Sequence, residues 1–393
     1  MNNKLFVILF AISVMLSCNT ATNPSVKGVV NIDLSTVLSD DDDDVALEDI
    51  IESIDRIIPL QTEEGALVDE IIGYLVTDEY IYILDMYEGR SVVIFNNKGE
   101  FVTRIRKGNG PGEINFAQHL FYDYENDRLF IQDFVCFMEY SKDGKFLQNY
   151  PIDYQVMNGS IEGVQKTHDG FLATVIEGVC DSKIIRFDTN MTVKWEIKLP
   201  HVPFELSKYV ARGVGGRNWI IRNLDNNLYN YSNDSIEICH LDLGDYEYSD
   251  VEEYEGDDPV GHLSKLIGNI NKGKYLFYSL PLFCESEDYL SFSLITKDSY
   301  GVDIYYHKDT KSVFKTKHID GSLMDVVYLN RRSKGDGNVF YGIINAERLS
   351  GGGWNWDGHN PNGLLSDSDM AVLKNVKLDD NPIIVIYTLK KDV

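Results

Sequence analysis

A glycine-rich stretch beside cationic side chains is the first place where this sequence could do chemistry. It contains Arg106, Lys107, Gly108, Asn109, Gly110, Gly112 and Glu113. Glycines let a ligand approach backbone N–H groups closely, and the flanking charges could add contacts. The Gly-Lys-Ser/Thr ending of a P-loop is absent, so the pattern does not indicate nucleotide binding. The alternative is a tight turn between two strands, with glycines at positive φ.

Two aspartates, Asp85 and Asp133, each end an apolar strand-like run, and they occupy equivalent places in successive copies of an internal repeat. Equivalent positions of a repeat reach the same face of a fold, so we expect both carboxylates on one rim, together with the glycine-rich stretch. Ca²⁺ prefers oxygen ligands, so the sequence allows a Ca²⁺ cofactor at this rim. The alternative is that each aspartate begins a polar turn.

The histidines do not form a recognisable catalytic or metal-binding pattern. The sequence has 8 of them, without His-Glu-x-x-His spacing, and it has no Gly-x-Ser-x-Gly nucleophile motif. His119, which follows Glu113 closely, is a candidate general base. The alternative is a strand histidine that its neighbours satisfy. We therefore assign no catalytic residue and no metal ligand set.

A second candidate surface is the loop at residues 351–363, which is rich in Gly and Asn and carries Trp354 and Trp356. Two exposed indoles beside Asn and Asp would form a stacking and hydrogen-bonding platform for a sugar or a peptide. The alternative is that the tryptophans fill the base of the last structural repeat.

The cysteines of the chain body are widely spaced and contain no Cys-x-x-Cys pair, so their spacing does not indicate a zinc site. They are Cys136, Cys180, Cys239 and Cys284. In an exported chain these cysteines could form disulfides, but their spacing does not show which of them would pair. Buried free thiols are the interpretation that we favour.

The composition narrows the class of protein. Apolar residues make up 44% of the chain and aromatic residues 12%, which excludes an intrinsically disordered protein. The formal net charge is 36 − 62 = −26. This charge argues against nucleic acids as partners and against electrostatic docking on anionic lipid. Enrichment in Tyr and Phe favours β-structure.

The N-terminus has the pattern of an exported lipoprotein. Met1 to Lys4 is weakly basic, and Leu5 to Leu16 is an apolar run that is too short to span a bilayer. The run ends at Ser17-Cys18, which is similar to a bacterial lipobox, in which the cysteine carries the lipid. The alternative is an ordinary signal peptide that happens to contain a cysteine. We expect anchoring to the outer membrane, on its periplasmic or its external side.

This pattern predicts three segments. Residues 1–17 are a lipoprotein signal peptide, residues 18–44 are a polar and acidic tether, and residues 45–393 are the folded domain. The run Asp40 to Asp44 at the end of the tether is interpreted as a solvated linker, with a Ca²⁺ or export signal as the alternative.

An internal repeat organises the folded domain. An aromatic residue, a polar turn and an apolar residue recur at Phe95, Tyr140, Phe187, Tyr231 and Tyr306. The first four copies are almost evenly spaced, and the acidic stretch 242–259 supplies an insertion in the longer gap before the fifth. About four short strands per ~45 residues is the period of a propeller blade. The sequence therefore predicts an all-β, six-bladed β-propeller of four-stranded antiparallel blades.

The sixth blade must combine both ends of the chain. Residues 338–344 and 382–389 are strand-like, and the early run 56–60 is available to close the ring and remove an open edge. Short helices are expected at residues 366–375, where Ser366 can cap, and at 45–51.

Four stretches resemble the six-bladed β-propeller lipoproteins of Bacteroides-like bacteria, which are related to NHL-repeat propellers. They are residues 57–62, 80–85, 108–113 and 380–387. The resemblance extends over nearly the whole mature chain, with a poor fit between Arg212 and Ser286. It implies a fold and a location in the cell envelope, not a reaction.

Two functions follow from these patterns. The favoured one is a non-catalytic scaffold that binds a glycan, a peptide or an envelope protein at the channel face. The alternative is an NHL-like metal-dependent hydrolase or lyase with its site in the central channel.

The lipobox-like ending gives a first prediction. Cys18→Ala should move the protein from the membrane fraction to the soluble envelope fraction, because the substitution removes the thiol that would carry the lipid. Fractionation and immunoblotting measure this. A variant that stays in the membrane fraction would contradict lipid anchoring.

Overall fold

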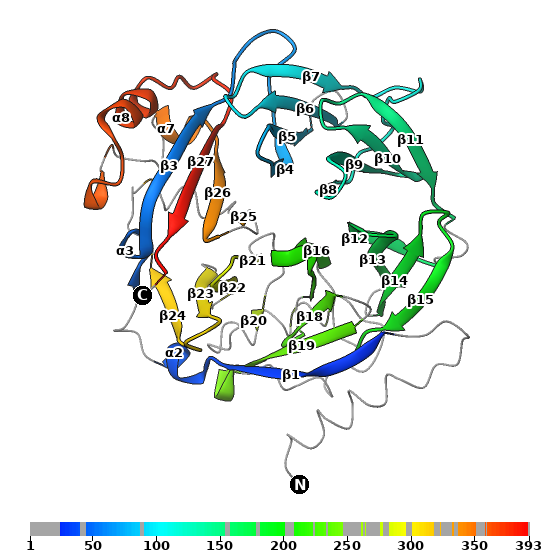
Figure 1. The fold of residues 1–393 in the computed structure, drawn as a ribbon. Coiled ribbons are helices and arrows are strands. Elements are labelled where there is room, and N and C mark those ends of the chain that lie inside the picture. Colours follow the sequence, from blue (N-terminus) through cyan, green and yellow to red (C-terminus); the bar gives the residue numbers. More distant parts are fainter. Residues whose placement is uncertain are drawn as a thin grey trace.

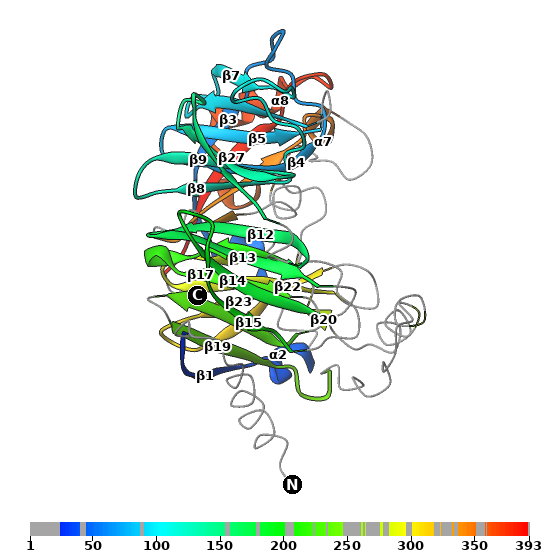
Figure 2. The same cartoon turned by 90° about the vertical axis from the view of Figure 1, so that its right-hand side faces the viewer.

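The computed structural model shows six β-sheets arranged around a central axis, as a six-bladed β-propeller (Figures 1 and 2). It describes residues 24–39, 45–86, 90–153, 158–177, 181–200, 208–222, 225–232, 235–246, 261, 264, 276–277, 283–295, 301–317, 323, 332–333, 337–350, 358 and 360–391. Within these residues, no helix is long and apolar enough to cross a membrane.

Blades 1 to 3 are each made of four consecutive antiparallel strands, from the innermost to the outermost. Blade 1 contains β4 (Ile71–Val76), β5 (Tyr80–Asp85), β6 (Ser91–Asn96) and β7 (Phe101–Ile105). Blade 2 contains β8 (His119–Asp123), β9 (Arg128–Asp133), β10 (Cys136–Ser141) and β11 (Phe146–Pro151). Blade 3 contains β12 (Ser160–Thr167), β13 (Gly170–Ile176), β14 (Ser182–Asp188) and β15 (Val193–Lys198).

Blades 4 to 6 each include a strand from the N-terminal part of the chain. Blade 4 contains β16 (Lys208–Arg212), β17 (Asn218–Arg222), β18 (Asn227–Ser232), β19 (Ser235–Asp242) and β1 (Ser25–Asp33). Blade 5 contains β20 (Leu276–Phe277), β21 (Cys284–Glu285), β22 (Tyr289–Ile295), β23 (Gly301–His307), β24 (Val313–Lys317) and β2 (Val45–Ala46). Blade 6 contains β25 (Arg332–Ser333), β26 (Val339–Ile344), β27 (Ile383–Leu389) and β3 (Ile51–Pro59).

The helices whose bounds fall within the described residues are short and connect or flank the blades. They are α2 (Ser35–Ser39), α3 (Leu47–Ile50), α7 (Glu347–Ser350), α8 (Asp367–Lys374) and the 3₁₀ turns η1 (Val214–Gly216), η2 (Gly244–Tyr246) and η5 (Pro361–Gly363). The expected helix at 366–375 is confirmed, and Ser366 and Asp369 form a reciprocal capping box at its start. The helix expected at 45–51 is confirmed only for Leu47–Ile50.

The recurring sequence motif is confirmed as the turn between the third and fourth strands of five blades. Four of these turns contain a residue with positive φ, namely Gly99, Gly144, Met191 and Lys311. Such a residue reverses the chain tightly enough for neighbouring strands to pair. The repeat is therefore visible in the sequence because one backbone conformation recurs.

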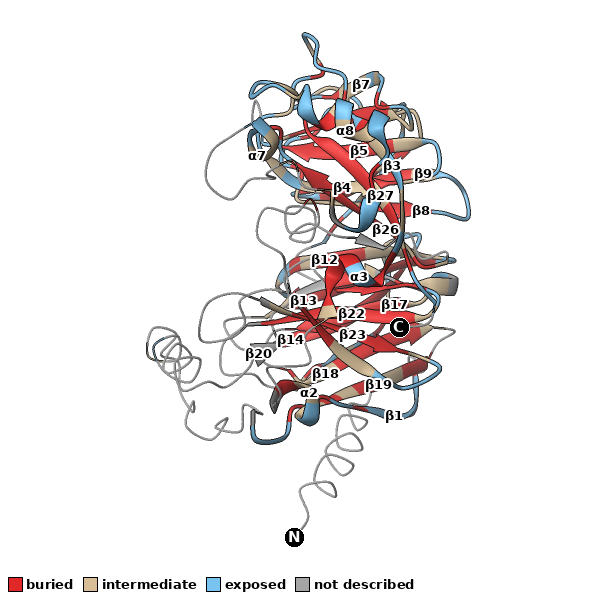
Figure 3. Cartoon of the chain, turned by 90° about the vertical axis from the view of Figure 1, so that its left-hand side faces the viewer, coloured by how far each residue is buried: buried red, intermediate tan, exposed pale blue. Residues whose placement is uncertain are grey.

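Apolar residues occupy both faces of the middle strands because each sheet packs between two others. In β5, Ile81 and Ile83 pack in a cluster with Tyr341 of blade 6. The alternate residues, Tyr82 and Leu84, pack in a different cluster, with residues of blade 2. Figure 3 shows the same distribution, with buried residues in the strands and exposed ones on connections.

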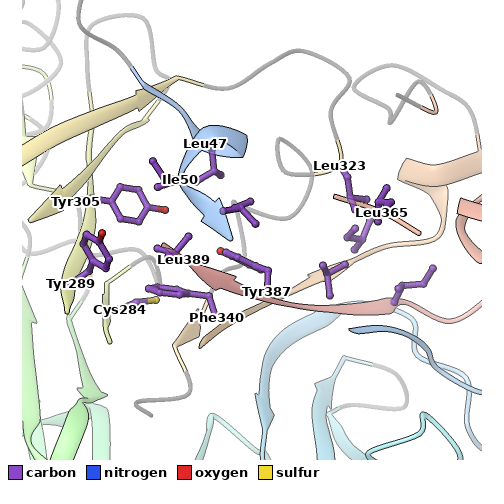
Figure 4. Close-up of a cluster of buried hydrophobic side chains, with 14 of the residues drawn as sticks. Leu47, Ile50, Cys284, Tyr289, Tyr305, Leu323, Phe340, Leu365, Tyr387 and Leu389 are labelled. Carbon is purple, nitrogen blue, oxygen red and sulfur yellow. The ribbon is translucent and has the colours of Figure 1, made fainter. Parts of the chain in front are cut away.

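The predicted closure of the ring is confirmed. β3, from the N-terminal part of the chain, pairs antiparallel with β27 from Pro59↔Ile383 to Ile51↔Leu389. The resulting core joins blades 5 and 6, with Tyr289 and Tyr305 on one side and Phe340 and Tyr387 on the other (Figure 4).

The expected tether is wrong for residues 25–39. Ser25–Asp33 forms β1, which pairs in parallel with β19, and α2 follows it. Ile32, Leu34 and Leu38 are buried against apolar residues of blades 4 and 5. Residues 1–23, Asp40 to Asp44 and the larger part of the acidic insertion, 247–259, lie outside the described residues.

Deleting residues 382–393 should destroy cooperative folding. The deletion removes β27, in which Ile383, Ile384, Val385, Tyr387 and Leu389 are almost fully buried. At about 1.5–3 kcal/mol for each buried apolar side chain, the loss is comparable to the whole stability of a domain. Thermal and urea unfolding of this truncation, with deletion of residues 392–393 as the control, measure the effect. A truncated protein that melts within a few degrees of the parent would contradict closure by β27.

Candidate functional site

One face of the propeller collects the residues with the strongest site features. We call it the rim face and define it as the face at which β5, β9, β13 and β17, the second strands of blades 1 to 4, end. Asp85 and Asp133 are the last residues of β5 and β9, so both lie on this face. Their shared position agrees with the sequence expectation.

Asp85 is completely buried, and its carboxylate oxygens accept hydrogen bonds from neighbouring residues of the protein. Oδ1 accepts the backbone N–H groups of Asp69 at 2.9 Å and Glu70 at 3.2 Å. Oδ2 forms an ion pair with Arg104 at 2.9 Å, between two side chains that are almost without exposure. The carboxylate therefore fixes the segment that leads into β4, the innermost strand of blade 1.

Asp133 has the same role in blade 2. Its Oδ2 accepts the N–H of Asn115 at 2.8 Å, and its Oδ1 accepts those of Phe116 and Phe134, both at 2.7 Å. Asp133 is 1% exposed, so its charge is compensated by these donors rather than by water. The carboxylate of Asp133 thus fixes the two turns that contain Phe116 and Phe134 relative to each other.

The glycine-rich stretch belongs to the connection between β7 of blade 1 and β8 of blade 2. Gly112 abuts Phe146 of β11, the outermost strand of blade 2, and its carbonyl accepts the hydroxyl of Tyr140 at 3.3 Å. Glu113 folds back, so that its Oε2 accepts the N–H of Gly110 at 2.8 Å. A Cβ atom on Gly108 would collide with the same carboxylate. These contacts describe a compact turn between blades, with Arg106, Lys107 and Asn109 exposed on it.

β7 ends and β8 begins on the rim face, so the stretch that joins them starts and ends there, although Gly112 packs against Phe146 at the outer edge of blade 2. That this stretch shares one channel rim with the aspartates stays a prediction. A ligand-binding role for its side chains stays a prediction. Trp354 and Trp356, the other candidate platform, and Cys18, the candidate lipidation site, lie outside the described residues.

His119, the candidate general base, begins β8 and pairs with Gln132 of β9. Burial, with a smaller contribution from the charge of Arg90, lowers the pKa of His119 from its ordinary value of 6.5 to about 4. The imidazole is thus neutral at pH 7. This environment is that of a strand histidine packed within the blade.

The described cysteines Cys136, Cys239 and Cys284 are buried and free, and Cys180 lies outside the described residues. Burial raises the pKa of Cys136 to about 11 and that of Cys239 to about 12. Both thiols are therefore protonated and weakly nucleophilic at neutral pH.

Another buried carboxylate, that of Glu285, lies between blades 4 and 5. Glu285 accepts Trp219 Nε1 at 2.7 Å and the N–H of Val214 at 3.1 Å, and it pairs with Lys308 at 3.2 Å and with Arg217. Its partners come from both blades, so it joins them. Across the part of the chain that is described, no three His, Cys, Asp or Glu residues are placed to hold a metal ion. A Ca²⁺ site stays a prediction from the sequence.

The rim face also carries exposed apolar side chains that the sequence analysis missed. Leu67, Met86, Phe116, Phe134 and Val135 are between 38% and 58% exposed. We call this set the apolar rim. Phe134 and Val135 form the whole turn between β9 and β10, where polar residues are usual. That unusual turn composition was the available sequence signal.

Hydrogen bonds and a cation–π contact connect these side chains across two blades. Met86 N–H binds the carbonyl of Glu70 at 2.9 Å, and Arg90 N–H binds the carbonyl of Met86 at 3.3 Å. The Arg90 guanidinium lies 4.0 Å from the centre of the Phe116 ring and donates to the carbonyl of Ala117 at 2.9 Å. One connected set of contacts therefore supports Met86 and Phe116 of the apolar rim.

The comparisons with known proteins agree with this fold. A family model described as "Domain of unknown function (DUF4934)" matches residues 29–388. No curated protein matches the chain. Among solved structures, a Bacteroides fragilis protein described as exported has 16% sequence identity and a TM-score of 0.65, covering 92% of this chain and 100% of that one.

Two further solved structures are more distant. A Bacteroides thetaiotaomicron protein of unknown function has 9% identity and a TM-score of 0.45, covering 94% of this chain and 76% of that one. Virginiamycin B lyase from Staphylococcus aureus has 10% identity and a TM-score of 0.42, covering 84% of this chain and 98% of that one. Neither likeness is high enough to inform function, and the Bacteroides fragilis structure supports the fold alone.

The lowered pKa of His119 predicts an acid-dependent loss of stability. The unfolded chain takes up a proton near pH 6.5, whereas the folded chain does so only near pH 4. The contribution of His119 is therefore present above pH 6.5 and is lost as the pH falls toward 4. Between pH 7 and 4.5 the loss is about 2 kcal/mol, at about 1.4 kcal/mol per pKa unit.

Urea unfolding of wild type and His119→Gln at both pH values isolates the contribution of His119 to the free energy of unfolding, since all other titratable groups contribute to both proteins. The variant should lose about 2 kcal/mol less on acidification. Identical pH dependence of the two proteins would show that His119 titrates normally.

Proposed function

We propose that this chain, which belongs to the family described as a domain of unknown function, DUF4934, is an exported protein of the cell envelope that binds a partner at its rim face. Export is proposed from the signal-like N-terminus, and the Bacteroides fragilis protein of similar fold is described as exported. The partner class is a glycan, a peptide or an envelope protein.

The position of β1 supports an orientation in which the rim face is accessible. β1 pairs with β19 in parallel, from Ser25↔Ser235 to Asp33↔Asp242. β19 ends at its connection to blade 5, on the rim face, so Ser25 lies at the opposite end of the strand. A lipid on Cys18 would be 25 − 18 = 7 residues from Ser25, a span of at most about 25 Å. Anchoring would thus hold the propeller by its opposite face.

Binding, rather than catalysis, is favoured by how the rim face uses its polar groups. Asp85 and Asp133 accept backbone N–H groups and an arginine, so their oxygens hold the fold in place. The groups left facing solvent beside them include the apolar rim. Catalytic acids and bases need free lone pairs or protons, whereas a binding surface needs apolar area with fixed geometry.

The single observation that carries this proposal is the shared use of Asp133 by Phe116 and Phe134. Both rings are exposed, yet the turns that bear them are fixed by one buried carboxylate. Preorganised aromatic side chains lose little conformational entropy when a partner binds, which makes them effective anchors. Exposed apolar patches on soluble domains commonly mark interaction sites.

The double variant Phe116→Ala/Phe134→Ala tests this role. Wild type and variant are screened on glycan and peptide arrays, with Leu147→Ala as the matched control, because Leu147 is exposed on the outermost strand of blade 2. We expect the affinity for any retained ligand to fall at least tenfold in the double variant and to be unchanged in the control. The melting temperature should stay within a few degrees, because exposed side chains contribute little to stability.

A ligand that binds wild type and double variant equally would contradict binding at the rim face.

A further inference from the structure

The apolar rim is flanked by carboxylates whose charge is not compensated within the described structure. Asp69 and Glu70 are exposed and lie directly between Leu67 and the Met86 turn. Their backbone N–H groups bind Asp85, and the carbonyl of Glu70 accepts Met86 N–H, so their position is fixed. In the described part of the chain, no ion pair involves either side chain.

Two cations of this region, Arg104 and Arg90, already have partners. Arg104 pairs with the buried Asp85 and donates to the carbonyls of Gly65 and Leu67. Arg90 covers the ring of Phe116 and donates to Ala117. Arg106 and Lys107 are exposed on the glycine-rich stretch, in which Gly112 packs against the outermost strand of blade 2. The exposed charges that closely follow Leu67 in the chain, and that adjoin Met86 through the backbone of Glu70, are those of Asp69 and Glu70, which are negative.

A complementary ligand must combine apolar groups with positive charge. The net charge of −26 repels polyanions at long range and attracts cations. A neutral sugar could cover the aromatic rings but would leave Asp69 and Glu70 without a counter-charge. A short peptide can present both chemistries, because its side chains follow one another every ~3.3 Å along an extended chain.

We propose that the apolar rim binds a peptide segment, of a protein partner, that joins large apolar side chains to a lysine or arginine. The apolar side chains of the peptide contact Phe116, Phe134 and Val135, and its lysine or arginine lies beside Asp69 and Glu70. This inference rests on the proposed function and names its partner class.

Synthetic peptides separate the apolar from the charged contribution. Three decapeptides share one apolar core of alternating Leu and Phe and differ only in flanking residues, which are Lys, Gln or Glu. Fluorescence anisotropy measures their affinities for the full chain. The Lys peptide should bind at least tenfold more tightly than the Glu peptide, with the Gln peptide between them. Raising the salt concentration from about 50 to about 500 mM should remove most of this difference.

Two sets of variants locate the contacts. Asp69→Asn/Glu70→Gln should abolish the preference for Lys while leaving the affinity for the Gln peptide unchanged. Phe116→Ala/Phe134→Ala should weaken all three peptides at least tenfold. The controls are Glu52→Gln and Leu147→Ala, which alter an exposed carboxylate and an exposed apolar side chain on outermost strands. Neither control should change any affinity.

The outcomes distinguish the two proposals. Equal affinities for the Lys and Glu peptides, or a Lys preference that survives Asp69→Asn/Glu70→Gln, would overturn the basic-peptide inference. The proposed function would still stand if Phe116→Ala/Phe134→Ala weakened the remaining binding. If only glycans bound in a rim-dependent manner, the inference would fail and the proposed function would hold. Binding that is unchanged in Phe116→Ala/Phe134→Ala would overturn both the basic-peptide inference and the proposed function.

Discussion

The antiparallel pairing of β3 with β27 is the interaction on which the rest of the structure depends. Each blade buries both of its faces against neighbours, so the ring is stable only when the first and last blades also meet. The N-terminal segment contributes more than this one strand, because β1, β2 and β3 join blades 4, 5 and 6 in succession (Figure 1). A single stretch near the start of the chain therefore supplies the outermost strands of half of the ring and covers the edges of β19, β24 and β27.

Buried carboxylates connect this scaffold to its surface. Asp85 and Asp133 occupy equivalent strand ends, and each binds the N–H groups of the segment that enters its blade. The same bonds that order the innermost strands also fix Leu67, Phe116 and Phe134 at the surface. A charge that is fully satisfied inside the protein thus supports an apolar surface outside it. Glu285 has a related role between blades 4 and 5, where its partners come from both sheets.

Much of the fold could be predicted because it depends on local chemistry. The turn at Gly99 recurs at Gly144 with the same positive φ, and the strands around both turns are apolar runs of the expected length. The site was less predictable. Asp85 and Asp133 were placed on the right face but were expected to face a ligand. Their burial depends on segments that precede the first strand of each blade, and no local pattern records that contact.

The sequence by itself determined the all-β class, the blade period and the shared closure of the last blade, since turn conformation and strand periodicity are properties of a few neighbouring residues. Only the tertiary structure decided that Ser25–Asp33 is a strand, because its partner β19 belongs to the fourth blade, far along the chain, and the pairing uses backbone groups that every residue has. The tertiary structure likewise decided which apolar residues stay exposed. Phe121 is buried and Phe116 is not, although both are phenylalanines close together in the chain, because exposure depends on what the neighbouring blade covers.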